Sequence, residues 1–130
     1  MSTDRPDCVF CASNWPNLDI VERWMPGGPA GSVAIVRPLN PVTDGHLLVI
    51  HREHDENAAA SFEASRRACL LMAVAADYMN VNGLQANIIT SIGPDATQTV
   101  MHTHLHIVPR RPDDGLLLPW TPVRLEGYLK

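Results

Sequence analysis

The spacing of apolar side chains changes along the chain between a strand-like and a helix-like pattern. Short runs rich in Val and Ile, or runs in which apolar and polar residues alternate, are typical of β-strands. Residues 55–80 instead carry apolar side chains at intervals of three and four, which predicts one long amphipathic helix. Its apolar stripe includes Phe62, Cys69, Met72, Ala73, Ala76 and Met79, and Leu70 and Val74 widen it. The predicted strands are residues 33–36, 46–50, 86–92 and 99–108, with residues 19–24 as a shorter candidate.

Turn-forming residues separate these segments. Asp44-Gly45 precedes the strand at 46–50, and Asn82-Gly83 ends the helix. Strands that are joined by short turns pair antiparallel, and the helix is the only large amphipathic element that can cover them. The sequence therefore predicts an α+β fold, an antiparallel sheet of about five strands with one long helix on one face. Cys69, on the apolar stripe of the helix, is expected to be a small core residue.

Length and composition indicate one domain. The chain has 130 residues, of which 45% are hydrophobic, and this is enough for one core. We expect a single domain over residues 1–130, with its motifs within residues 7–112 and an irregular tail at 113–130. No apolar run approaches the ~20 residues that cross a membrane, and a net charge of −4 does not suit bulk nucleic-acid binding. The polar first residues and only three cysteines predict a cytoplasmic protein with reduced thiols.

Histidine is the residue type whose distribution indicates chemistry. All six histidines fall within residues 46–54 and 102–106. In the second group His102, His104 and His106 alternate with other residues, so on a strand they share one face, while Leu105 and Ile107 face the other way and pack under the helix. Neutral imidazole can act as a nucleophile, a metal ligand or an acid–base group. A three-histidine metal site and a solvated strand face are the alternatives at this point.

The residues around these histidines carry a family resemblance. The motif comprises Asp44-Gly45-His46, Gln98-Thr99-Val100 and His102-x-His104-x-His106-Ile-Val. It resembles the histidine-triad (HIT) superfamily of nucleotide hydrolases and transferases. The resemblance extends over about residues 7–112, and the predicted order of strands and helix agrees with it.

The resemblance implies a role for each residue of the motif. His104 would be the nucleophile that attacks the α-phosphorus of a nucleotide and forms a nucleotidyl-histidine, which water then hydrolyses. His46 and His106 would flank the phosphate and stabilise charge on its oxygens. Gln98 and Thr99 would lie near the leaving group as hydrogen-bond donors. Judged from the residues alone, His46 could instead only close a turn, and Gln98 and Thr99 could be ordinary strand-entry residues.

The third histidine of the motif favours hydrolysis. The nucleotidyltransferase branch of the resembled superfamily carries Gln at this position, whereas this chain keeps His106. We therefore expect cleavage at the α-phosphate of a nucleoside phosphoramidate or a dinucleoside polyphosphate, without a catalytic cofactor. Because family members are usually homodimers, the resemblance also implies a homodimer that binds a nucleotide.

Three positions depart from the family pattern. Pro38 stands where an Asp or Asn commonly contacts the ribose, and Thr97 stands where Gly is frequent. Ser91, a predicted substrate-binding residue, stands near a position where Asn or Gln is usual. These changes concern the selection of the nucleoside more than the phosphate chemistry. They motivate an alternative function, a nucleotide-binding regulatory module with little or no turnover.

The N-terminal cysteines predict a metal site. Cys8 and Cys11 have the spacing at which two thiolates bind one zinc ion, although a redox pair is the competing interpretation of such a motif. Zinc-containing members of the resembled family use two further histidines, which match His54 and His102 here, and His51 is an alternative to His54. Four protein ligands leave no open coordination position, so the implied zinc would be structural.

Overall fold

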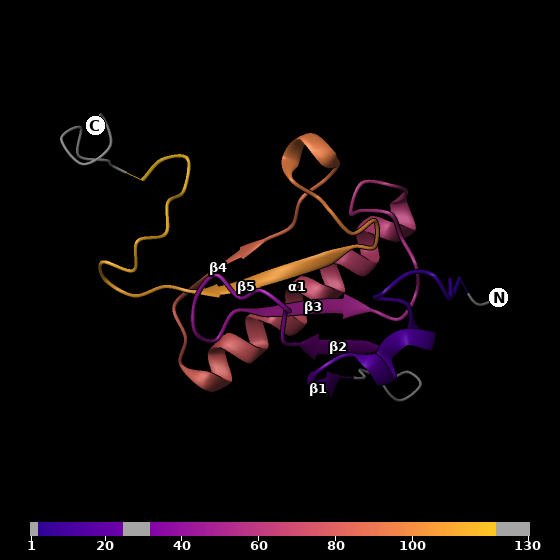
Figure 1. Cartoon of the computed structure of the whole chain (residues 1–130), viewed down its shortest axis with the longest axis horizontal. Helices are drawn as coiled ribbons and strands as arrows, with labels where there is room; N and C mark the ends of the chain where they lie inside the picture. The colour runs from indigo at the N-terminus through magenta and orange to yellow at the C-terminus, as the bar shows by residue number, and fades with distance from the viewer. Residues whose placement is uncertain (1–2, 25–31, 122–130) are drawn as a thin grey trace.

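A five-stranded antiparallel sheet forms the centre of the structure. The computed structural model describes residues 3–24 and 32–121 of the chain. The strands lie in the order β1-β2-β3-β5-β4, and each neighbouring pair is antiparallel (Figure 1). The α+β fold class predicted from the sequence is therefore confirmed. The elements are η1 (Ala12–Asn17), β1 (Ile20–Trp24), β2 (Val33–Val36), β3 (Leu47–His51), α1 (Phe62–Asn82), β4 (Ala86–Ile89), η2 (Pro94–Ala96) and β5 (His104–Pro109).

Helix α1 packs on one face of the sheet and buries the main core. The helix passes behind the strands in the view of Figure 1. Every second residue of β2, β3 and β5 points toward it, because successive side chains of a strand face opposite sides. Leu105 and Ile107 lie in this core, as the alternation in the sequence predicts. The buried residues are Val33, Ile35, Leu47, Val49, Leu71, Val74, Ala75, Leu105 and Ile107.

The N-terminal segment covers part of the opposite face of the sheet. Phe10 and Trp15 are buried there in a second apolar cluster, and the indole N–H of Trp15 donates to the carbonyl of Phe10 at 2.9 Å. This hydrogen bond satisfies a polar group that would otherwise be buried without a partner. The strands contribute Ala34, Val36, Leu48 and Ile50 to the cluster. Strand β5 lies beside it and carries histidines on this same face.

The sequence leaves the start of the helix open, because Asp55, Asn57 and Ser61 could each cap it, and the structure begins α1 at Phe62, directly after Ser61. Ser61 has an extended backbone, and its hydroxyl accepts the N–H three residues further on at 3.0 Å, which caps the first turn. Residues 55–60 are not helical, and Asp55 instead forms a two-bond ion pair with Arg67 at 2.7 and 2.8 Å. Gly83 ends the helix in the left-handed conformation, with φ of 65°, which glycine adopts without strain.

The buried face of α1 overlaps only part of the stripe that the sequence predicts, since Val74 is buried and Leu70 and Met79 pack against the core. Cys69 is exposed, so the expectation that it is a core residue is wrong. Phe62 and Met72 are exposed as well. The helix carries small apolar side chains on more than one side, so spacing alone does not tell which stripe meets the sheet. Its buried residues are Ala64, Leu71, Val74 and Ala75.

Strand β5 begins at His104, so the prediction of a strand from residue 99 is wrong in its first half. The preceding residues are held by loop contacts, and the N–H of Thr103 donates to the carbonyl of Asp55 at 2.9 Å. His102 therefore lies in a bend, and only His104 and His106 share a strand face. Within residues 3–24 and 32–121, no helix combines the length and apolar character that crossing a membrane requires.

Candidate active site and metal cluster

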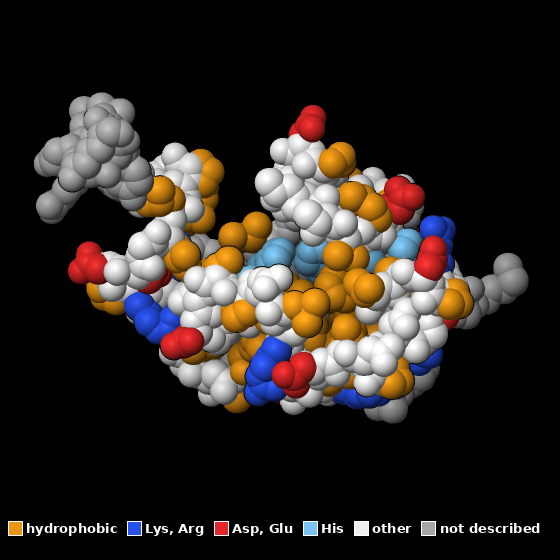
Figure 2. Space-filling model, in the orientation of Figure 1, with side chains coloured by type: hydrophobic (Ala, Val, Ile, Leu, Met, Phe, Trp, Pro, Cys, Tyr) orange, Lys and Arg blue, Asp and Glu red, His pale blue; other side chains and the backbone are white. Residues whose placement is uncertain are grey.

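His104 and His106 lie next to each other on the face of the sheet that α1 does not cover. Across the sheet, His104 pairs with Ile50 and His106 pairs with Leu48 of β3, and both partners belong to the second apolar cluster. The two imidazole rings are in edge contact, with centroids 5.2 Å apart. Figure 2 shows histidine side chains reaching the surface in a row along this face, bordered by hydrophobic side chains. A ligand can therefore approach these rings from outside.

A backbone hydrogen bond decides which ring nitrogen of His104 is available. Its Nδ1 lies 2.8 Å from the carbonyl oxygen of His102. Because a carbonyl oxygen can only accept, Nδ1 carries the proton and Nε2 keeps its lone pair. The hydroxyl of Thr90, just beyond β4, donates to the carbonyl of His104 at 2.8 Å and holds its backbone. Among residues 3–24 and 32–121, no hydrogen bond engages Nε2 of His104, so this nitrogen is available to a ligand.

A chain of hydrogen bonds determines which ring nitrogen carries the proton in His46 and in His106. The N–H of Val42 donates to Nδ1 of His46 at 3.1 Å, so the proton of His46 resides on Nε2. That Nε2 lies 2.9 Å from Nδ1 of His106 and donates to it. The proton of His106 must then reside on its own Nε2. Both nitrogens of His46 are engaged within the protein, whereas His106 retains one N–H donor for a ligand.

Burial keeps these imidazoles neutral. It lowers the pKa of His46 and the pKa of His104 below the ordinary value of 6.5. The pKa of His106 falls to about 4, chiefly through burial and then through the adjacent His104 and His46. All three rings are neutral at pH 7, which is the protonation state that the hydrogen-bond chain requires.

The other predicted site residues differ in how free their side chains are. Gln98 is buried and its amide is fully engaged. Its Oε1 accepts the N–H of Gly93 at 2.8 Å, and its Nε2 donates to two backbone carbonyls at 2.5 and 3.0 Å. Thr99, the next residue, is exposed, and Ser91 is half-buried beyond the end of β4. Gln98 therefore holds the loop that presents Thr99, while Thr99 itself can meet a ligand.

A cluster of two cysteines and two histidines lies beside these imidazoles. Cys8, Cys11, His54 and His102 each offer one ligand atom, and these atoms lie within 4.8 Å of one another. The Sγ to Nδ1 distances are 3.4 Å for Cys8 to His102, 3.4 Å for Cys11 to His54 and 3.6 Å for Cys11 to His102. Sulfur and nitrogen ligands of a tetrahedral zinc ion, bound at about 2.3 and 2.0 Å, lie about 3.5 Å apart. The structure thus brings together all four predicted ligands with a spacing that could hold a metal ion and is compatible with zinc.

A backbone contact fixes the tautomer of His102 in this cluster. Nε2 of His102 donates to the carbonyl of His51 at 2.8 Å, which leaves the Nδ1 lone pair directed at the sulfurs. His102 is fully buried, and burial lowers its pKa to about 4, so the ring is neutral. Burial raises the pKa of Cys11 to about 11. The ring of His51 lies outside the cluster, since its Nδ1 accepts the N–H of Glu53 at 2.9 Å. Of the two candidates, the structure favours His54.

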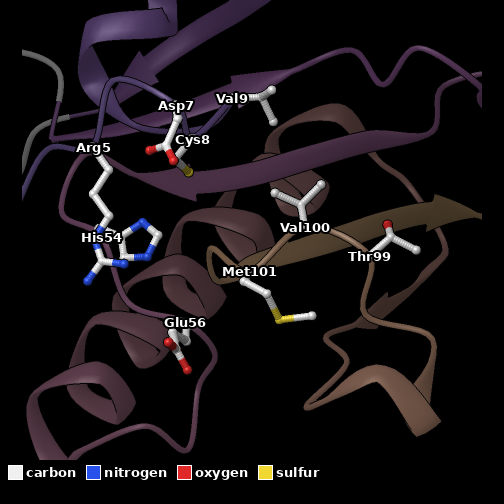
Figure 3. Close-up of a pocket in the computed structure, with 9 residues that line it drawn as sticks. All are labelled: Arg5, Asp7, Cys8, Val9, His54, Glu56, Thr99, Val100 and Met101. Carbon is white, nitrogen blue, oxygen red and sulfur yellow. The ribbon is translucent and has the colours of Figure 1, made fainter.

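A pocket of about 360 Å³ opens beside the metal cluster. Three segments, residues 5–9, 54–56 and 99–101, contribute to its lining (Figure 3). It shares Cys8 and His54 with the metal cluster and Thr99 with the predicted phosphate site. Such a volume is at the lower end of the range for small-molecule sites. The lining residues are Arg5, Asp7, Cys8, Val9, His54, Glu56, Thr99, Val100 and Met101.

Comparisons with known proteins identify the family. A family model described as the HIT domain matches residues 30–113, which is more than half of the chain. The chain belongs to the HIT family. A HIT-like protein of Borreliella burgdorferi is 33% identical over 119 residues, which cover 84% of this chain and 79% of that protein. The adenosine 5'-monophosphoramidase hnt1 of Schizosaccharomyces pombe is 30% identical, with 87% and 82% covered. The structure of a histidine triad protein from Clostridium difficile shares the fold, with a TM-score of 0.71, 22% identity, and 92% and 99% covered.

Two departures from the HIT pattern have visible consequences in the structure. Thr97 follows η2 in the left-handed conformation, with φ of 72°, which glycine adopts with less strain than threonine. Pro38 lies in the loop after β2 and has no polar side chain to offer a ribose. The histidines of the motif are thus all present, whereas Pro38 cannot make the polar side-chain contact that the family resemblance implies at this position.

Two contributors to the site are not among the residues predicted from the sequence. Val42 acts through its backbone N–H, which no side-chain pattern can reveal. Phe10 lies between Cys8 and Cys11 of the metal cluster, and its ring contacts the ring of His104 with centroids 5.2 Å apart. The only sequence signal for Phe10 is its place inside the Cys-x-x-Cys motif of this HIT protein.

Proposed function

We propose that the protein is a nucleotide hydrolase that acts at an α-phosphate through a nucleotidyl intermediate on His104. The observation that carries the proposal is the hydrogen bond from Nδ1 of His104 to the carbonyl of His102, 2.8 Å long. It leaves Nε2 as a neutral nucleophile on the open face of the sheet. Membership of the HIT family and the similarity to a monophosphoramidase support a nucleotide hydrolase in general.

The reaction would take place in two displacements. In the first, the Nε2 lone pair of His104 forms a bond to phosphorus, and the leaving group departs with the electrons of its bond to phosphorus and takes up a proton. In the second, water attacks phosphorus, His104 recovers its lone pair, and a proton is released. The Nε2–H of His106 would donate to a phosphate oxygen and stabilise the charge that develops there. His46 would keep His106 in the tautomer that can donate, and the hydroxyl of Thr99 would assist at the leaving group.

The substrate would be a nucleoside phosphoramidate or a dinucleoside polyphosphate. Both contain an α-phosphate that this site can attack, and the pocket beside Thr99 offers space for the departing group. Gln98 would act by holding the loop that carries Thr99, since its amide oxygen and both amide hydrogens already bond to the backbone. Ser91 would contribute on the β4 side of the site. We propose that the reaction needs no catalytic cofactor.

We propose that the metal of the Cys8–Cys11–His54–His102 cluster is zinc and that it is structural. Two thiolates and two imidazoles are a common ligand set for tetrahedral zinc, and four protein ligands leave no position for substrate. The residues come from the N-terminal segment, the loop after β3 and the bend before β5. Zinc would therefore tie these three segments together and contribute to folding. Reduced cysteines of this kind suit the cytoplasm, where we place the protein.

We also propose that the protein is a homodimer. β4 is an edge strand, and Ile89 on it is exposed. Helix α1 carries exposed Phe62, Met72 and Val81. An edge strand with free backbone groups and an apolar helix surface are both features that a second copy can cover.

The decisive experiment is a rapid-quench reaction followed by intact-mass analysis. Wild-type protein is mixed with labelled adenosine phosphoramidate or with a diadenosine polyphosphate, and the mass of the protein is recorded on the millisecond scale. We expect an added nucleotidyl group that is absent from His104→Ala and present in His51→Ala, whose ring lies outside both clusters. Tight binding with neither adduct nor product would overturn the hydrolase and support a nucleotide-binding regulatory module instead.

A further inference from the structure

Phe10 is in direct contact with the nucleophilic histidine. Its ring centroid lies 5.2 Å from that of His104, at an interplanar angle of 65°, and 6.1 Å from that of His102, at 82°. Both are edge-to-face arrangements, which aromatic rings favour. Phe10 is only 8% exposed, so the contact with His104 is buried rather than a chance surface encounter.

We propose that Phe10 is a positioning residue, which holds the imidazole of His104 in the orientation from which Nε2 attacks phosphorus. This proposal rests on the nucleophilic role proposed for His104. The hydrogen bond at Nδ1 restrains one atom of that ring but leaves it able to tilt about that atom. Ring contacts with Phe10 and with His106, both at 5.2 Å, limit the tilt. Removing the Phe10 ring would leave the tautomer unchanged and the direction of Nε2 less well defined.

The position of Phe10 is itself determined by the metal cluster. Phe10 lies between Cys8 and Cys11, whose sulfurs both approach the metal-binding nitrogen of His102. Its carbonyl accepts the indole N–H of Trp15 at 2.9 Å. The backbone on both sides of Phe10 is therefore anchored. A structural metal at this site would thus act on the reaction indirectly, because it places an aromatic ring against the nucleophile.

Three roles for Phe10 predict three different outcomes when it is replaced. A residue that only fills the core affects stability and leaves the rate of adduct formation unchanged. A residue that contacts the nucleoside affects the affinity for nucleotide. A positioning residue lowers the rate of adduct formation at saturating substrate while nucleotide affinity and metal content stay the same, because misorientation of a reacting group is costly even when binding is intact.

The test compares Phe10→Leu with Val36→Ala. Val36 belongs to the same apolar cluster as Phe10, and its substitution controls for loss of packing. Phe10→Met serves as a second ring-free variant should Phe10→Leu not fold, since methionine adapts to irregular gaps. For each protein, three quantities are measured: the metal content, the Kd of adenosine monophosphate, and the rate of adduct formation with adenosine phosphoramidate at saturation.

We expect Phe10→Leu to slow adduct formation about ten-fold or more, with the Kd within about two-fold and full metal content. Val36→Ala should keep the wild-type rate. An unchanged rate in Phe10→Leu, or an effect on the Kd alone, would overturn the proposal. Nitrogen-15 NMR of the His104 ring provides an independent readout, since its signals should shift or broaden in Phe10→Leu even if wild-type protein forms no adduct. Absence of the adduct in wild type would thus disprove the hydrolase alone, whereas unaltered His104 signals in Phe10→Leu would disprove the role of Phe10.

Discussion

Replacing His106 with glutamine should make the stability of the protein less sensitive to acid. Burial and the adjacent His104 and His46 hold the pKa of His106 at about 4, against 6.5 for an ordinary histidine. Between these two pH values the unfolded chain binds a proton at this residue and the folded chain does not. Stability must therefore fall as the pH is lowered through 6.5, and the loss levels off below about 4.

The size of this effect follows from the two pKa values. A group that titrates at 6.5 when unfolded and at about 4 when folded costs almost nothing at pH 7.5 and about 2 kcal/mol at pH 5. His106 is only half-buried, and solvent screening reduces the expected cost to about 1 kcal/mol. Glutamine does not titrate, so this contribution disappears in His106→Gln. The other histidines with a lowered pKa remain in both proteins, and their contribution largely cancels in the comparison.

The assay is urea unfolding of wild type and His106→Gln at pH 7.5 and at pH 5. The metal content is measured at each pH, so that only samples with equal occupancy are compared. Wild type should lose about 1 kcal/mol more than His106→Gln on going from the higher to the lower pH. Equal losses in the two proteins would show that His106 is not held neutral by the fold, and the proton assignment along the His46–His106 pair would have to be abandoned.

Three further predictions concern the core, the metal and the assembly. Leu71→Ala should lower the free energy of unfolding by about 2–5 kcal/mol, because Leu71 is fully buried under the sheet. The control is Leu39→Ala at an almost fully exposed position, which should change the free energy of unfolding by less than about 0.5 kcal/mol in the same urea titration. Elemental analysis should find about one zinc per chain in the wild type and in the control Cys69→Ser, but not in Cys8→Ser. Retention of zinc with full thermal stability in Cys8→Ser would contradict the ligand assignment. If the protein forms the proposed dimer, Ile89→Lys should convert it to a monomer in analytical ultracentrifugation, because a charge on the β4 edge opposes pairing with a second copy. A sedimentation coefficient equal to that of the wild type would exclude this edge as the interface.

Features that depend on neighbouring residues were predictable from the sequence. The alternation in β5 places Leu105 and Ile107 under the helix and His104 and His106 on the other face, since side-chain direction in a strand has a period of two. The caps at Ser61 and Gly83 also depend on nearby residues. At the start of the helix, however, Asp55 and Asn57 are equally suitable caps by sequence. Asp55 lies outside the helix and pairs with Arg67, and the sequence around Asp55 does not reveal this contact.

The buried stripe of α1 was not predictable in the same way. Cys69 and Met72 recur at helical spacing just as Leu71 and Val74 do, and only the first pair is exposed. A helix with apolar residues on several sides can present any of them, and contact with the sheet decides which stripe is buried. The sequence determines that the helix is amphipathic, and the packing determines its rotation.

For the site as well, the sequence determines the residue types and the tertiary structure determines their arrangement. The sequence by itself determined which residue types are present: a histidine triad, a Cys-x-x-Cys pair and the motif of the HIT family. Only the tertiary structure brought Cys8 and Cys11 to His54 and His102, which are distant along the chain, because ligand geometry requires all four at one point in space. It also decided which nitrogen of His104 is free, because the acceptor for its other nitrogen is a backbone carbonyl whose position depends on the bend before β5.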